Sequence, residues 1–547
     1  MDFTERNGAN PVSKVLYHNA KFWPGTARGK IFDALLVDGH RISATGANAL
    51  NAPHDSEVDL NGAFVTPSFG DGHAHPLFGG RQSFGPQITG LETLKEIVQE
   101  VARFAAAHKD LEWIIGGTYD PAIDPDGNFD AHWLDDVVSD RPVVLNGMDY
   151  HTIWVNSEAL RRCGIDADAP DLEIGTIVRR PDGTPMGTLR EWDAVNLVMS
   201  KAPLPSMDRE IASLEYSSKR YASHGITWWQ DAWVDPGMAE AYLAAEAAGV
   251  IKQGVNLAFR ADPRSWEKDL PYFLKMRADI ENSPTNKNIT ARTIKFFADG
   301  VIEGGTAALL EPYANDPCSH GMPVWQWKEL TRAICTMDKA GFQVHIHAIG
   351  DAGIRASLDA IENAIKENPL WDRRPTIVHV QLLDPADLPR FAQLGVIANF
   401  GPLWTRQDPM QAISSAPRIG PERTDRQYQL RTLLDDGVRI AFGSDWPVTS
   451  EIPLEGIAVP VHRQTPDRLP VGGWMPHEAI TIQEAFQSYT SEVAHQAYAD
   501  QLWGKLEVGF NADFIVLDKN PFEIDPHDVP AITVMKTVRN GETIYSQ

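Results

Sequence analysis

Two histidines one residue apart follow an apolar stretch in FVTPSFGDGHAHP (residues 64–76), at the point where a strand would end. Imidazole and carboxylate groups stand at the ends of other apolar stretches later in the chain. These groups are the ligands that zinc and similar divalent metals prefer. A single histidine is more often a hydrogen-bonded core residue than a ligand, but the repeated pattern predicts a metal site. The candidate ligands are His73, His75, His347, His379 and Asp445, and His345 accompanies them.

A lysine stands among these candidates. Lys295 lies inside the apolar sequence TIKFF, and burial lowers the pKa of a lysine because its charged form loses hydration. A neutral amine can capture carbon dioxide and become a carbamate, an anionic group that could bridge two metals with one oxygen each. The alternative is an unmodified lysine that binds a substrate carboxylate.

Eight apolar stretches, many of them separated by helical stretches, fill the middle of the chain. Such alternation indicates a parallel sheet, and eight units predict an α/β fold, a (β/α)₈ barrel. The C-terminal ends of barrel strands face one mouth, so the candidate ligands are expected to meet there. The strands are expected at residues 64–70, 225–233, 254–260, 292–300, 342–351, 375–381, 395–401 and 438–448, and helices at 207–223, 327–340, 352–367 and 384–394.

Both ends of the chain carry short alternating strands broken by turn residues, such as DALLVDGHRISATG and ITVMKTVRNGETIYSQ. The Asn-Gly pair in the second is typical of a two-residue hairpin turn. We therefore predict a small composite β-sandwich built from residues 1–63 and 496–547, with the barrel over residues 64–495. Residues 80–205 are too many for a plain loop between two barrel strands, which predicts an inserted subdomain over the barrel mouth.

Charge and cysteine content limit the partners and the compartment. The formal net charge of −25 argues against nucleic acid and against an anionic membrane surface as partners. The three cysteines are far apart, which fits a reducing cytoplasm. Neither a signal peptide nor an apolar run of membrane-spanning length is evident. We expect a cytoplasmic protein that acts on a small molecule, and a homodimer is left open.

Taken together, the motifs resemble those of the amidohydrolase superfamily, whose order is His-x-His, lysine, histidine, histidine, aspartate. HAIGD and GSDWPV are similar more specifically to the amidohydrolase-3 group, which includes N-substituted formamide deformylase and YtcJ-like hydrolases. YHTIWVNSEAL and GTIVRRPDGTPMGTLRE match that group's insertion. VTPSFGDGHAH differs from the family's pattern at Ser68, where glycine is usual. The resemblance covers nearly the whole chain.

The resemblance implies a role for each candidate residue. His73 and His75 would hold the more buried of two divalent metals, zinc foremost, and carboxylated Lys295 would bridge to the second. Asp445 would bind a metal and act as the base. The pattern gives His345 no role, so it either supports a ligand or faces the substrate. The second metal would be held by His347 and His379, and the residues on the substrate side would be His151, Glu191 and Asp120, for which a structural role is the alternative.

The implied reaction is hydrolysis of a carbon–nitrogen bond other than a peptide bond, in an amide, formamide or cyclic amide. A metal-activated hydroxide would attack the carbonyl, and Asp445 would carry the proton to the leaving nitrogen. Ester and carbamate hydrolysis by the same groups is left open. The sixteen tryptophans, including Trp192, Trp228, Trp229, Trp404 and Trp446, fit either an aromatic substrate or barrel packing.

Two other functions are weighed against hydrolysis. A one-metal deaminase of an aminated heterocycle would carry a glutamate shortly after the fifth-strand histidine and no fourth-strand lysine. Here His347 is followed by AIGD, and Lys295 is present. A non-catalytic scaffold would have lost its ligands, whereas all the expected ligands are intact. The number of metal ions per chain would distinguish the hydrolase, with about two, from the deaminase, with one, and the scaffold, with none.

Overall fold

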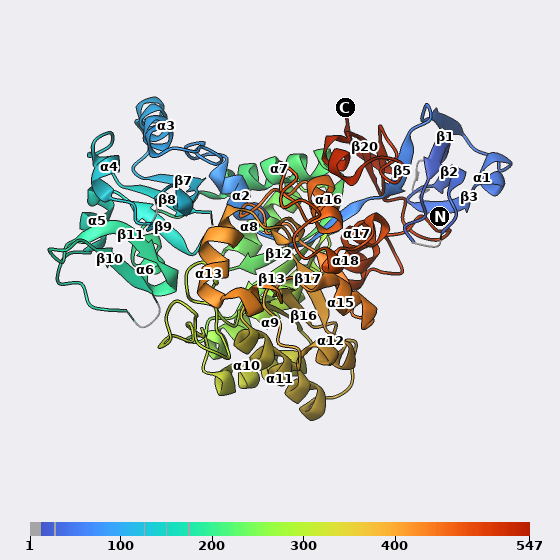
Figure 1. The fold of residues 1–547 in the computed structure, drawn as a ribbon. Coiled ribbons are helices and arrows are strands. Elements are labelled where there is room, and N and C mark those ends of the chain that lie inside the picture. Colours follow the sequence, from blue (N-terminus) through green and yellow to red (C-terminus); the bar gives the residue numbers. More distant parts are fainter. Residues whose placement is uncertain (1–12, 27–28, 125, 149, 173–174) are drawn as a thin grey trace, which may run out of the picture.

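The computed structural model describes residues 13–26, 29–124, 126–148, 150–172 and 175–547. Eight parallel strands that follow one another along the chain form a nearly closed barrel at its centre (Figure 1). This confirms the predicted (β/α)₈ fold. The strands are β6 (Phe69–Ala74), β12 (Ile226–Val234), β13 (Gly254–Arg260), β14 (Ile289–Phe297), β15 (Gln343–Ala348), β16 (Thr376–His379), β17 (Ile397–Phe400) and β18 (Ile440–Phe442).

Helices between these strands and after the last of them surround the barrel. In α10, Leu330, Ala333, Ile334 and Met337 are buried at the spacing of one helix face, so the helix packs its apolar side inward. The helices of this layer are α7 (Met207–Ser223), α8 (Met238–Ala247), α9 (Trp266–Asn282), α10 (Trp327–Lys339), α11 (Asp351–Glu367), α12 (Leu388–Leu394), α15 (Leu430–Asp435), α16 (Pro453–His462), α17 (Ile482–Tyr489) and α18 (Ser491–Gln496). Shorter pieces, α13 (Ala416–Ile419) and α14 (Pro421–Thr424), belong to the loop after β17.

The last strand meets the first through its following loop. The backbone N–H of Ser444 donates to Asp71 Oδ1 at 2.9 Å, and the N–H of Asp445 donates to the carbonyl of His73 at 2.7 Å. Gly443 lies so close to His73 that a Cβ at this position would stand 2.5 Å from its backbone nitrogen. The seam of the barrel thus brings two candidate ligands together and requires glycine beside them.

The strand expected over residues 64–70 is divided between two sheets. β5 (Phe64–Pro67) pairs with strands from the chain ends, whereas β6 belongs to the barrel. The switch occurs at Ser68, whose N–H donates to Asp513 O at 3.1 Å, while the N–H of Phe69 donates to Gly225 O at 2.9 Å. Ser68, the single residue between the two strands, therefore marks where the chain passes from the outer sheet into the barrel.

Strands from both chain ends share one eight-stranded sheet, as Figure 1 shows beside the barrel. The residue limits of the three domains stay predictions. The sheet contains β1 (Lys14–Phe22), β2 (Phe32–Asp38), β3 (Arg41–Thr45), β4 (Ser56–Asp59), β5, β19 (Phe514–Leu517), β20 (Val534–Arg539) and β21 (Glu542–Ser546), with α1 (Ala47–Leu50) beside it.

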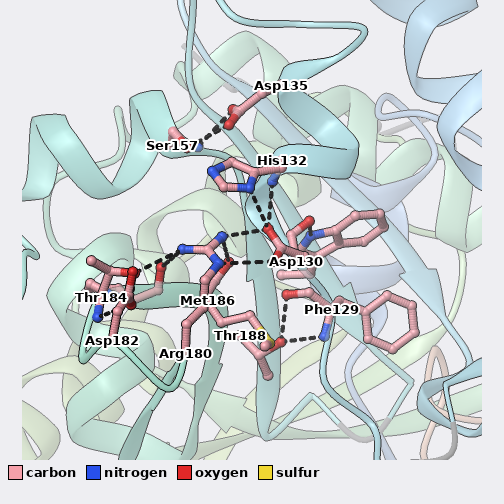
Figure 2. A network of polar contacts seen from close by, with 12 residues as sticks. Phe129, Asp130, His132, Asp135, Ser157, Arg180, Asp182, Thr184, Met186 and Thr188 are labelled. Atoms are coloured by element: carbon pink, nitrogen blue, oxygen red, sulfur yellow. Dashed lines mark hydrogen bonds and ion pairs between the residues drawn. The ribbon is translucent and has the colours of Figure 1, made fainter.

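The segment between the first and second barrel strands has a sheet and cores of its own. Figure 2 shows how it is held together: Arg180, just after β10, donates to both carboxylate oxygens of Asp130, at 2.5 and 3.0 Å. Asp130 also accepts from the N–H of His132 at the start of α4. The segment contains α2 (Pro76–Gln82), α3 (Leu94–Ala107), β7 (Ile114–Tyr119), α4 (Ala131–Asp135), β8 (Val143–Gly147), β9 (Thr152–Val155), α5 (Ser157–Cys163), β10 (Thr176–Arg179), β11 (Pro185–Arg190) and α6 (Glu191–Met199). Among the described residues, no helix is long and apolar enough to cross a lipid bilayer.

Candidate metal centre

All six predicted metal ligands line one cavity of about 1380 Å³ at the barrel mouth. The barrel supplies part of its wall and the inserted segment another part. The residues come from the ends of five barrel strands or the loops that follow, as expected of a barrel active site. They are His73, His75, Lys295, His347, His379 and Asp445.

Three of these side chains already approach one another as metal ligands do. One donor atom each from His73, His379 and Asp445 lies within 4.8 Å of the other two. Asp445 Oδ1 is 3.4 Å from His73 Nε2 and 3.0 Å from His75 Nε2. The ring centroids of His347 and His379 are 4.6 Å apart. The donor set therefore fits a divalent metal at this point.

The protonation of these histidines suits the same role. Burial holds the pKa of His73, His347 and His379 well below the ordinary value, and the nearby Lys295 ammonium adds to the effect. Metals bind the neutral form of imidazole. The site thus offers its lone pairs without first having to release protons.

Lys295 is fully buried, and its Nζ has no hydrogen-bond partner among the described residues. The centroid of the Phe297 ring lies 4.5 Å from this Nζ. Burial lowers the pKa of this amine to about 7, against the opposing effect of Asp445. An unpartnered amine beside metal ligands fits conversion to an anion that bonds a metal.

Residues behind the ligands fix their orientation. His73 Nδ1 lies 2.7 Å from Nε2 of His345, and His345 is fully buried behind the cavity wall. His75 Nδ1 lies 4.0 Å from Oδ1 of Asp231, too far for a hydrogen bond, and Oδ2 of Asp231 accepts from the hydroxyl of Tyr242. Partners on the second nitrogen are typical of metal-binding histidines because they set the ring's tautomer. This placement favours a supporting role for His345 over substrate contact.

Two buried acids behind the ligands, Asp231 and Asp299, were not predicted from the sequence. Asp231 is an acid within the apolar sequence WWQDAW, and that burial was the available signal. Asp299 accepts from the backbone N–H groups of Ile349, Gly350 and Ala308 at 2.8 to 3.0 Å. It therefore anchors the HAIGD segment.

The orientation of His347 is set by a backbone carbonyl. His347 Nε2 lies 3.2 Å from Gly300 O, which leaves Nδ1 as the nitrogen able to bind a metal.

The inserted segment contributes a histidine–carboxylate pair to the cavity. His151 Nδ1 lies 2.9 Å from Glu191 Oε2, and both residues line the cavity wall. The ring centroid of His151 is 6.0 Å from that of His347. Asp120 instead caps the short helix η1 (Pro121–Ile123) by accepting from Ala122 N at 2.8 Å. A structural role therefore fits Asp120 better than contact with the substrate.

Aromatic side chains form much of the remaining wall. The indole of Trp404 stacks on His379 with ring centroids 5.1 Å apart. Trp192 and Trp233 lie side by side, 4.8 Å apart, and both line the cavity. Trp233 was not singled out from the sequence. The other tryptophans considered above, Trp228, Trp229 and Trp446, are buried in the protein core.

Comparison with known proteins gives a consistent result. The model of the amidohydrolase family matches residues 56–545. The chain is 29% identical over 549 residues to the putative amidohydrolase YtcJ of Bacillus subtilis, covering 98% of this chain and all of that protein. It is 27% identical over 550 residues to N-substituted formamide deformylase of Arthrobacter pascens, covering 97% and 98% of the two chains.

The fold also matches solved structures. An uncharacterized metal-dependent hydrolase from Pyrococcus horikoshii superimposes with a TM-score of 0.75 at 21% identity, covering 94% of this chain and 99% of that one. At this level of identity, the match speaks for the fold alone.

Proposed function

Because the chain belongs to the amidohydrolase family and is a hydrolase, we propose that it cleaves a carbon–nitrogen bond other than a peptide bond. The bond is in an amide, a formamide or a cyclic amide. The observation that carries this proposal is the approach of His73, His379 and Asp445 to within 4.8 Å inside a cavity that can hold a small molecule. The similarity to a formamide deformylase supports the same bond type.

We propose that this centre holds two divalent metals, with zinc foremost. His73 and His75 would hold one, His347 and His379 the other, and Asp445 and a carbamate on Lys295 would complete the set. Bound divalent metals lower the pKa of water and polarise a carbonyl oxygen. The buried, unpartnered Nζ of Lys295 supports the carbamate, because an ammonium at that place would repel both cations.

Asp445 is the group that moves the proton. Burial raises the pKa of its carboxyl, but His75, His379 and Lys295 outweigh burial and hold the pKa below its ordinary value. The carboxylate therefore starts ionised and faces the histidine cluster. It accepts a proton from the attacking water and returns it to the leaving nitrogen, as one group can in both halves of a hydrolysis.

The cavity wall orients and shields the substrate. Trp192, Trp233 and Trp404 present apolar faces beside the centre, which suits an aromatic or aliphatic body and excludes water from the reacting bond. His151, held by Glu191, offers a polar group to the substrate from the inserted segment. A cytoplasmic location remains part of the proposal and is supported by three free cysteines.

A panel of N-formyl, N-acetyl and cyclic amides tests the proposed function. The metal-loaded protein should release the amine and the acid from at least one of these classes. An aminated heterocycle serves as the contrasting substrate, with release of ammonia as the readout. Ammonia release from that compound, with no cleavage of any amide, would replace the proposal with a deaminase.

A further inference from the structure

A second group of nitrogen-bearing side chains lines the same cavity without belonging to the candidate metal centre. Arg406 lies on the loop after β17, His462 ends α16, and Arg468 follows in the next loop. His527, in the short helix η5 (Pro526–Ala531), joins them. Two of these four residues, Arg406 and Arg468, are cations, although the formal net charge of the chain is −25 and Asp408 and Glu455 line the same cavity. The two arginines place positive charge close to a molecule that enters this part of the cavity.

Arg406 is near the candidate metal centre along the chain. It stands two residues beyond Trp404, the indole that stacks on His379 at 5.1 Å. Two residues span at most about 7 Å. A molecule whose amide lies at the metal centre can therefore extend past Trp404 toward Arg406.

Arg406 also has hydrogen-bonding capacity to spare. Its Nε is buried and has no hydrogen-bond partner among the described residues. Within the described part of the chain, the ion pair of Arg406 is with Asp408, whose Oδ2 lies 4.0 Å from Nε, at the distance limit. A buried N–H that lacks an acceptor costs free energy, which an acceptor on a ligand would recover.

His462 supplies a neutral donor beside the arginines. Its Nδ1 accepts from the backbone N–H of Gln464 at 3.0 Å, which leaves the proton on Nε2. Burial and the neighbouring His527 lower the pKa of His462 to about 4, so the ring is neutral near pH 7. His527 stacks on it with centroids 4.2 Å apart and an interplanar angle of 5°.

His527 itself has no donor to offer a ligand. Its Nδ1 lies 2.7 Å from Asp525 Oδ1, and its Nε2 lies 2.8 Å from Gln464 Oε1. These two contacts hold the His527 ring, which stacks on the ring of His462 and so fixes it. Arg468 is exposed and has no carboxylate within 4.0 Å among the residues that the structure describes, so it can approach an anion at the cavity rim.

We propose that Arg406, assisted by His462 and Arg468, binds a carboxylate group of the substrate while the scissile amide lies at the metal centre. The planar guanidinium matches a carboxylate with two parallel hydrogen bonds, which a neutral amide cannot reproduce with the same strength. This inference rests on the proposed function and narrows it: the substrates are N-acylated amino acids or related acids.

Paired substrates test the inference. N-acyl amino acids with increasing distance between amide and carboxylate are each compared with the primary amide of the same acid. For at least one length, the metal-loaded wild-type protein should show a kcat/KM about tenfold or more higher for the acid, the size expected of hydrogen bonds to a charged group. Arg406→Gln should reduce that ratio toward one and leave the kcat/KM for the neutral partner nearly unchanged.

Arg439→Gln is the matched control, because Arg439 is exposed, pairs with Glu492 and lies outside the cavity wall. This variant should keep the wild-type ratio. A ratio that stays the same in Arg406→Gln, or a preference for the neutral amide at every length, would overturn the inference.

A binding measurement separates failure of this inference from failure of the proposed function. Phenylalkanoic acids and the corresponding phenylalkanols, which contain no amide, are titrated into the metal-loaded protein by calorimetry. The acid should bind about tenfold more tightly than the alcohol in the wild type, and this advantage should disappear in Arg406→Gln. An advantage that persists in Arg406→Gln would place the carboxylate at the metal centre instead and would overturn the inference. If no amide is hydrolysed, the proposed function fails, and the calorimetry still decides whether Arg406 binds carboxylates.

Discussion

Two of the candidate ligands adopt a backbone conformation that side chains rarely take. His379 has a φ of 77° and Asp445 a φ of 56°, both in the left-handed region. Each costs on the order of 1 kcal/mol or more and persists only where the surroundings impose it. For Asp445, the hydrogen bond from its N–H to His73 O across the barrel seam is one such restraint. Strain of this kind is concentrated at functional sites, which agrees with a ligand role for both residues.

Replacement of Asp445 tests proton transfer. Asp445→Asn keeps the size of the side chain but removes the base, so kcat should fall by about 10²–10⁴, the usual contribution of general acid–base catalysis. Binding of a non-hydrolysable substrate analogue, measured by calorimetry, should change much less. Turnover close to that of the wild type would remove Asp445 from the mechanism.

Replacement of Lys295 tests the bridging carbamate. Lys295→Ala should lose one or both metals and most of the activity, because an anionic oxygen ligand is removed. Acetate or propionate could enter the space left and supply oxygens, so partial recovery of metal content and activity is expected on adding them. A lysine that only binds substrate would not be replaced by an anion. Recovery with small amines instead of acids would contradict the prediction.

The ligands were predictable from sequence, but their supports were not. Histidines and an aspartate at the ends of apolar strands stand out because such positions rarely carry them. The contact of His345 with His73 and the placement of Asp231 behind His75 each involve different strands of the barrel. They depend on strand register and side-chain rotamers, which a strand's own residue pattern does not determine.

At the level of elements, ion pairs connect the loop that carries Asp445 to the C-terminal end of α7. Glu451, at the end of this loop, is buried, and its Oε1 forms ion pairs with Arg220 Nε at 2.5 Å and with His224 Nδ1 at 2.9 Å. Burial alone raises the pKa of Glu451, but His224 and the charge of Arg220 outweigh burial and hold the pKa below its ordinary value. This ion pair therefore stabilises the folded state when Glu451 is ionised.

The pH dependence of the free energy of unfolding tests the ion pairing of Glu451. A carboxyl whose pKa is lowered on folding adds stability above its ordinary value of about 4.5, and the gain is lost as the pH falls through that region. Glu451→Gln should therefore lower the free energy of unfolding by about 1–3 kcal/mol at pH 7, and the difference should shrink toward pH 4. Denaturant titrations at several pH values measure this.

Glu329→Gln is the control, because its ion pair with Arg332 is exposed. It should have little effect at any pH, since exposed pairs contribute at most about 1 kcal/mol. A difference for Glu451→Gln that does not vary with pH would contradict the account.

Element positions were largely predictable, with one instructive exception. The helix expected over residues 207–223 is α7 with the same limits, and each predicted barrel strand overlaps an observed one. The division of residues 64–70 between two sheets was not predicted, because both halves are apolar and buried. The partners that divide them, Asp513 O and Gly225 O, lie far away in sequence. A local pattern shows that a segment is a buried strand but not which sheet it joins.

At the scale of the whole molecule, the last part of the chain supports the first barrel strand. β19 pairs with β5, which leads directly into β6 and His73. Ile515 of β19 is fully buried and belongs to the same apolar core as the barrel. A Cβ added at Gly225 would stand 2.9 Å from its side chain. The outer sheet and the barrel are thus packed on each other.

Shortening of Ile515 tests this packing. Ile515→Ala should lower the free energy of unfolding by about 2–5 kcal/mol, as expected for a buried aliphatic side chain that leaves a cavity. Val508→Ala is the control, because Val508 is 61% exposed and should change stability by no more than about 0.5 kcal/mol. Equal effects of the two substitutions in denaturant titrations would contradict a shared core.

Titration of metal into metal-free protein tests whether this barrel mouth is a metal-dependent hydrolytic site. The protein is stripped with a chelator, zinc is added in measured equivalents, and hydrolysis of the best amide from the substrate panel is followed at each step. We expect no hydrolysis without metal and a rise to a plateau at about two equivalents, as for a two-metal site. Full hydrolysis by protein that elemental analysis shows to be free of metal would contradict it.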